Sequence, residues 1–256
     1  MMRWLAAGVF AIAAATVSAD ELPAACGSDP SLRLPLERLE REQREEVQQA
    51  LQLIDGSARR VLALRSYIRS GDVIAARWSW TQQQIDTYRA SDEYRDLLAE
   101  IDKIRVQFEQ ANPGTTLYAN TDVRSLDQQL QRWNENKSVG AIAAELQQTL
   151  CAEAAANPSL TKPANALRDF LVRWQPSSPA PLAAPGLSLH GRARAIDFQI
   201  EQGKRIIAGP DTSRIADDWV ASGWAGKLRT AIEKASPRFH GPLTMPNEPW
   251  HFEYRP

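Results

Sequence analysis

The chain has 256 residues, enough for one sizeable domain or two small ones. Apolar residues make up 43% of it and charged residues 24%, as in an ordinary soluble globular protein. The formal net charge of -1 argues against bulk electrostatic binding to nucleic acid, which requires a strongly basic face.

The N-terminus has the pattern of an export signal. Arg3 precedes an uncharged apolar stretch over residues 4–17, and small residues lead up to Ala19. This predicts a signal peptide over residues 1–19, cleaved after Ala19; the alternative is an anchor that is never cleaved. The stretch is shorter than the about 20 apolar residues of a membrane span, and no later stretch is apolar enough to cross a bilayer. We therefore expect a mature protein that is soluble and periplasmic or extracellular.

The two cysteines, Cys26 and Cys151, are expected to pair in such an oxidising compartment. A bridge between them would close a long loop, which contributes about 4–5 kcal/mol in the chain-entropy model. The alternative is two free buried thiols. Neither cysteine belongs to a Cys-x-x-Cys motif, which argues against redox catalysis.

Residues 33–110 are predicted to be helical. Apolar residues recur there at steps of three and four, with interruptions at Gly56 and Gly71, and Asn112-Pro113-Gly114 ends the last segment. We expect a helical hairpin or three-helix unit within residues 20–112. It either packs on the second half of the chain or binds a protein partner, which the pattern does not identify.

The second half mixes strand and helix patterns. Strands are predicted at 115–119, 193–200 and 250–254, and helices at 125–133, 138–151, 164–174, 213–222 and 224–235. Ser125 and Ser138 are the expected N-caps of the first two of these helices. The Pro-rich segment 175–186 is either a linker or a loop that frames a cleft.

All three histidines lie in the last third of the chain, two of them near acids. His190 and Asp197 flank the start of a predicted strand, and Glu248 comes three residues before His251. Two imidazoles and an aspartate are a sensible three-ligand set for Zn²⁺, with Glu248 left to accept a proton from water. On residue types alone, the alternative is structural histidines and an ordinary acid at a strand end.

The local sequence around these residues resembles a family of zinc peptidases. Residues 188–198 (SLHGRARAIDF) resemble its Ser-x-His-x-x-Gly-x-Ala-x-Asp motif, and residues 248–254 (EPWHFEY) look like its Glu-Pro-Trp-His motif followed by an aromatic. Residues 121–128 (TDVRSLDQ) are similar to its Tyr-Arg-Ser…Gln segment. The family contains D-alanyl-D-alanine carboxypeptidases, the D-Ala-D-Ala dipeptidases of vancomycin resistance and related peptidoglycan endopeptidases.

The resemblance implies an α+β fold, in which an N-terminal helical region precedes a small antiparallel-sheet zinc peptidase domain over residues 113–256. It implies His190, Asp197 and His251 as the Zn²⁺ ligands. Glu248 becomes the general base, which later protonates the leaving amine.

Three further residues take roles from the resemblance. Arg124 becomes the cation that binds a substrate carboxylate or stabilises the oxyanion, since its planar fork suits both; the alternative is a surface ion pair. Ser188 becomes a hydroxyl near the substrate, or simply ends a turn. Trp250 is core or pocket wall. His240 is unassigned, with a structural role favoured.

One position departs from the family pattern. The glycine of the first motif falls at Ala193, where alanine would be strained if the position needs a positive φ. The alternative is that Gly191, two residues earlier, shifts the turn.

The resemblance implies an exported zinc metallopeptidase that hydrolyses amide bonds of peptidoglycan stem peptides. D-Ala-D-Ala carboxypeptidase is the first expectation, and an endopeptidase the second. The competing hypothesis is a non-catalytic cell-wall-binding or regulatory module whose helical region recruits a partner.

Overall fold

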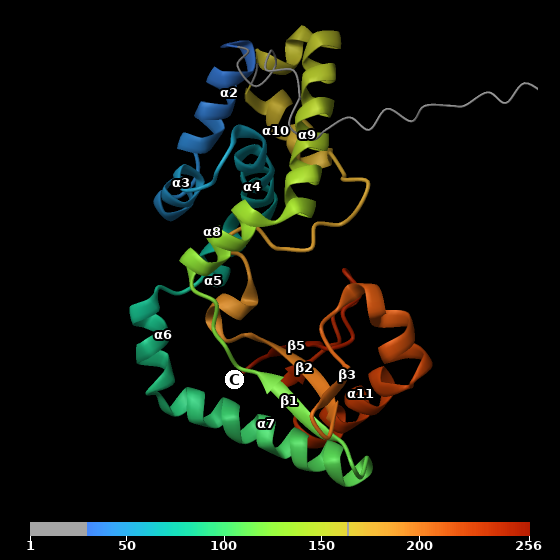
Figure 1. The fold of residues 1–256 in the computed structure, drawn as a ribbon. Coiled ribbons are helices and arrows are strands. Elements are labelled where there is room, and N and C mark those ends of the chain that lie inside the picture. The colour runs from blue at the N-terminus through green and yellow to red at the C-terminus, as the bar shows by residue number, and fades with distance from the viewer. Residues whose placement is uncertain (1–29, 163) are drawn as a thin grey trace, which may run out of the picture.

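The computed structural model describes residues 30–162 and 164–256, which form an α+β fold with a helical N-terminal region (Figure 1). The predicted signal peptide and Cys26 lie outside these residues. Export and the Cys26–Cys151 bridge therefore stay predictions. No helix in the described part of the chain is long and apolar enough to cross a membrane.

The core is divided between two bodies (Figure 1). The first, which we call the helical body, packs around Leu39, Tyr67, Trp133 and Leu146. Its helices are α2 (Pro30–Arg41), α3 (Glu45–Gln52), α4 (Ser57–Ser70), α5 (Ile74–Arg77), α8 (Leu126–Glu135), α9 (Lys137–Ala156) and α10 (Ala164–Arg173).

The second, the sheet body, packs around Phe108, Phe198, Trp219 and Phe252. Its helices are α6 (Gln82–Arg89), α7 (Asp92–Ala111) and α11 (Trp224–Ala235), with a π-helical segment over Ile215–Ala221. Its strands are β1 (Thr116–Asn120), β2 (Ala195–Gln202), β3 (Arg205–Ala208), β4 (Phe239–His240) and β5 (His251–Tyr254).

Strand β2 is the centre of the antiparallel sheet. It pairs along one edge with β1, and β5 and β3 pair with its first and last residues, while β4 pairs with β5. Residues on the core face of β2, such as Ile196, Phe198 and Ile200, are almost fully buried. This alternation leaves Asp197 on the opposite face, where the candidate site lies.

The predicted division at residues 112–113 differs from the division of the core. Helices α6 and α7, placed by the prediction in the N-terminal region, pack in the sheet body, whereas α8, α9 and α10, placed in the second domain, pack in the helical body. Over the described residues the chain therefore passes between the bodies three times, at 78–80, 123–126 and 187–193. Periodicity shows which face of a helix is buried but not which partner covers it, so the sequence pattern missed this interleaving.

The predicted elements of the second half form with small shifts in their ends. Ser125 caps α8 as predicted, since its hydroxyl accepts a hydrogen bond from the Gln128 N–H. The predicted cap Ser138 is wrong: the Asn136 side chain accepts from the Val139 N–H at 2.9 Å, so α9 begins before Ser138. Strands β3 and β4 were not predicted.

Candidate metal centre

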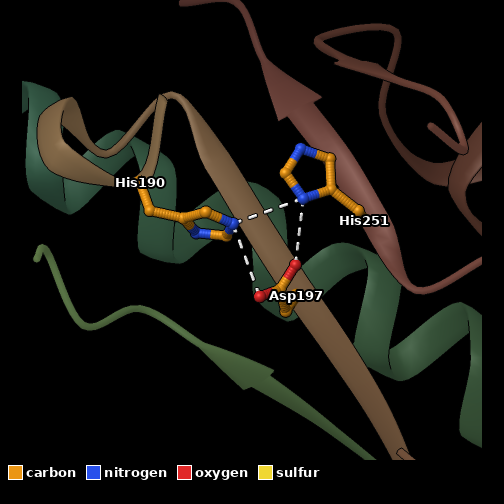
Figure 2. A group of neighbouring side chains, drawn as sticks. All are labelled: His190, Asp197 and His251. Atoms are coloured by element: carbon orange, nitrogen blue, oxygen red, sulfur yellow. Dashed lines mark hydrogen bonds and ion pairs between the residues drawn. The ribbon is translucent and has the colours of Figure 1, made fainter. Parts of the chain in front are cut away.

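Three elements bring the predicted ligands together (Figure 2). His190 lies on a short 3₁₀ turn over Leu189–Arg192, Asp197 on β2 and His251 on β5. Asp197 and His251 are register partners, so their side chains leave the sheet on the same face. The group could hold a metal ion, because one donor atom from each residue lies within 4.8 Å of the others.

The distances within this group suit a small tetrahedral ion. His190 Nε2 lies 3.2 Å from His251 Nδ1 and 3.4 Å from Asp197 Oδ2, and His251 Nδ1 lies 3.1 Å from Asp197 Oδ1. Ligand atoms about 2.0–2.1 Å from a tetrahedral ion are separated by about 3.3–3.4 Å. The two imidazole nitrogens also face one another, which places two lone pairs together unless a proton or a cation lies between them.

Burial favours the ligand forms of these side chains. His190 and His251 are only 7% and 8% exposed. Burial lowers the pKa of His190, which keeps its ring neutral and able to bind a metal. Burial alone would raise the pKa of Asp197, but hydrogen bonds with His190 and His251 hold it well below its usual range.

Glu248 lies beside the group without joining it. Its Oε2 is 3.6 Å from His251 Nδ1, and its backbone forms a bridge with Leu243. Burial raises the pKa of Glu248. A carboxylate in this position can exchange a proton with a molecule bound next to the three donors, which is the role predicted for Glu248 as a general base.

Arg124 contacts the group through Asp197. Its Nη2 donates to Asp197 Oδ2 at 3.2 Å, and burial lowers the pKa of its guanidinium. The ion pair considered as an alternative therefore exists, but with an expected metal ligand and not with a surface acid. Arg124 uses one of its five N–H groups in this contact, so the other N–H groups of the guanidinium can donate hydrogen bonds to an anion.

Gln129, which no predicted role marked, ties Arg124 to Ser79 in the first passage between the bodies and to Gly186 just before the third. Its amide nitrogen donates to Ser79 Oγ and to the Arg124 carbonyl, both at 2.8 Å, and its carbonyl oxygen accepts from the Gly186 N–H at 3.0 Å. The Arg124 N–H in turn donates to the His190 carbonyl at 3.2 Å. Gln129 is only 8% exposed, and this burial of a polar side chain marks it as a structural residue. The sequence did not show the burial, because it depends on how α8 packs in the fold.

The turn that carries His190 is close-packed. Gly191 has no room for a side chain: an added Cβ would lie 2.0 Å from Ser79 Oγ. Ala193 has φ 52°, the one positive φ of a residue other than glycine in the described chain. The strain expected at Ala193 is therefore present, and Gly191 does not relieve it.

The remaining predicted residues are placed as follows. Ser188 and Trp250 both line the cavity that contains the metal group. Trp250 is also buried against Trp219, so it is both core and pocket wall. His240, exposed on β4, does not belong to the metal group. Cys151 lies on α9, in the helical body.

The cavity lies between the two bodies and measures about 910 Å³. The sheet body contributes the metal group, Glu248 and the loop around Met245, and the helical body contributes α8 and the Pro-rich segment near Leu182. Of the two interpretations of residues 175–186, the structure supports a loop that frames a cleft.

No family model, no curated protein and no solved structure matches the chain.

Proposed function

We propose that the protein is a zinc-dependent peptidase that hydrolyses amide bonds of peptidoglycan stem peptides. The observation that carries the proposal is the convergence of His190, Asp197 and His251 on one point of a cavity, with the carboxylate of Glu248 beside them. Binding alone needs no proton acceptor next to the cation, so this arrangement favours hydrolysis over a purely binding module.

His190, Asp197 and His251 would hold the ion, and their two nitrogens and one oxygen are a donor set that Zn²⁺ accepts. Bound zinc would supply Lewis acidity, which lowers the pKa of water and polarises a carbonyl. Hydrogen bonds with His190 and His251 keep Asp197 ionised, so its carboxylate would balance part of the charge of a bound cation.

Glu248 takes the proton of the attacking water and delivers it to the leaving amine. Burial raises the pKa of Glu248, which makes the carboxylate a better proton acceptor than an exposed glutamate. Arg124 binds the carboxylate that follows the scissile amide, and its position beside Asp197 sets that carboxylate next to the reacting bond.

The first substrate that we propose is a peptide ending in D-Ala-D-Ala, with a cross-linked stem peptide as the second. The resemblance of residues 188–198 and 248–254 to peptidoglycan peptidases and the export signal predicted for residues 1–19 support this choice. Digestion of purified muropeptides, followed by mass spectrometry, tests it. Release of D-alanine indicates a carboxypeptidase and loss of cross-linked dimers an endopeptidase, whereas unchanged muropeptides with zinc-loaded protein would rule out both.

A further inference from the structure

Two arginines of the helical body line the same cavity as the metal group. Arg77 is the last residue of α5, and Arg132 lies in the last turn of α8. Both side chains are exposed, and among the described residues neither has a carboxylate within ion-pairing distance. The charge of Arg132 also contributes to lowering the pKa of Arg124, which indicates that the two guanidinium groups are neighbours.

The acids that line the cavity already have partners. Asp197 meets Arg124 and the two histidines, Asp211 accepts from Ser213, Glu248 lies next to His251, and Glu253 pairs with Arg255. With neutral histidines, the lining carries three arginines and four carboxylates, a formal charge of -1 that a divalent ion changes to +1. The charge left to meet a ligand is thus positive, and it lies on the helical wall.

We propose that Arg77 and Arg132 form an anion subsite that binds an acidic group of the peptide substrate, separate from the carboxylate that Arg124 binds. The inference rests on the proposed function for the identity of the substrate. A cavity of about 910 Å³ accommodates a peptide of several residues, so one molecule can reach both the metal group and the helical wall. The helical body then selects peptides that carry an acidic side chain upstream of the scissile bond.

The test compares two peptides that differ by one charge, Ac-Glu-Lys-D-Ala-D-Ala and Ac-Gln-Lys-D-Ala-D-Ala. Their affinities are measured by calorimetry with the zinc-loaded full chain carrying Glu248→Gln, so that neither peptide is consumed. We expect the glutamate peptide to bind about 10-fold more tightly, since charged hydrogen bonds are lost with the glutamine peptide. The preference should shrink between about 50 and 200 mM salt, because the Debye length falls by about half over this range.

The variants assign the effect to the two arginines. Arg77→Gln and Arg132→Gln, singly and together, should reduce and then remove the preference for the glutamate peptide. Arg173→Gln is the matched control: Arg173 is an exposed arginine at the end of α10, outside the cavity lining, and its loss should leave the preference unchanged. Because both sites are exposed at helix ends, circular dichroism should show that the single variants remain folded.

The outcomes separate this inference from the proposed function when hydrolysis of both peptides by the unsubstituted protein is measured in parallel. A glutamate preference that vanishes in the double variant, without hydrolysis, supports the subsite and contradicts the peptidase. Hydrolysis with equal affinities, or with a preference that survives in the double variant, overturns the subsite alone. Failure to bind or cleave either peptide contradicts both proposals.

Discussion

Asp197 and His251 face one another across the β2–β5 pair, with 3.1 Å between Oδ1 and Nδ1. A shift of one residue in the pairing of these strands would turn His251 to the core face of the sheet. The candidate metal centre therefore depends on the register of a four-residue strand, β5, whose outer neighbour β4 has only two residues.

Replacement of His251 by alanine should abolish tight zinc binding, because two of the three donors cannot complete the site. Zinc content after dialysis, measured by mass spectrometry, checks this. His240→Ala is the control, since His240 is exposed outside the metal group and its loss should leave zinc content unchanged. Equal zinc content in the two variants would place the metal elsewhere.

Removal of the metal from the unsubstituted protein should lower its melting temperature. A ligand at 100 times its Kd stabilises the native state by about 2.7 kcal/mol, which corresponds to about 5–10 °C in a protein of this size. Differential scanning calorimetry before and after chelation measures the shift. Restoring zinc should reverse it, and His251→Ala should show no shift at all.

Glu248→Gln should retain zinc and lose hydrolysis, by about 10²–10⁴-fold in kcat, because the amide cannot accept the proton of water. Glu253→Gln is the matched control, since Glu253 also lines the cavity but pairs with Arg255. Rates on a D-Ala-D-Ala peptide are compared at equal zinc content. Undiminished hydrolysis in Glu248→Gln would refute the role given to Glu248.

The raised pKa of Glu248 also predicts a pH profile. A base must be ionised to accept a proton, so activity should rise with pH through the pKa of Glu248. Burial raises that pKa, and the acidic limb should accordingly lie above the range of an exposed glutamate. The dependence of kcat on pH, measured at saturating peptide, checks this, and a limb at or below the ordinary glutamate range would contradict it.

The turn at residues 189–193 makes a prediction about stability. Ala193→Gly should raise the free energy of unfolding by about 0.5–1 kcal/mol, because glycine relieves the positive φ at some cost in unfolded-chain entropy. Gly191→Ala should lower it by about 1–3 kcal/mol, because its Cβ would overlap Ser79. Urea unfolding of both variants measures the two changes in the free energy of unfolding. The prediction fails if the two changes have the same sign.

Glu100 tests the stability of the sheet body at a position outside the cavity lining. Its Oε2 accepts a hydrogen bond from Ser236 Oγ at 2.5 Å, and its Oε1 pairs with Lys103 at 2.6 Å. Burial alone would raise the pKa of Glu100, but these hydrogen bonds lower it overall. Because the folded-state pKa is the lower one, the stabilisation is present at neutral pH and is lost as pH falls through that pKa.

Glu100→Gln should therefore cost stability at pH 7 and cost less at pH 3. Urea unfolding at the two pH values measures the difference, with Glu109→Gln on the same helix as a comparison. A loss of stability independent of pH would show that the charge of Glu100 is not what stabilises the contact.

The motifs around His190 and His251 predicted which side chains meet, because residue types and spacing encode ligand chemistry directly. Strands β1, β2 and β5 were also predictable: β1 and β2 are rich in β-branched, aromatic and other apolar residues, and polar and aromatic residues alternate along the sequence of β5. Strand β3 was missed although Gly203 begins a tight turn before it, which is a usable hairpin signal. Strand β4 has two residues and no pattern of its own.

What the sequence could not supply is the pairing of distant elements. Gln129 and Arg132 lie on a helix whose apolar stripe predicts burial. Ser79 and Gly186, which bond to Gln129, and Arg77, which lines the same cavity as Arg132, come from other segments of the chain. Such contacts depend on tertiary packing, which local periodicity does not record. The anion subsite proposed above is visible only once those segments are placed side by side.

The interleaving of the two cores limits which fragments of the protein can fold when they are expressed separately. A fragment that starts at residue 113 contains every proposed metal ligand but lacks α7, whose residues Leu97, Ile104 and Phe108 are wholly enclosed in the intact chain. The same fragment retains α9 without α4, against which it packs. Expression of the motif-bearing half by itself would thus expose two hydrophobic surfaces that are buried in the intact chain, so tests of the proposed activity call for the intact polypeptide.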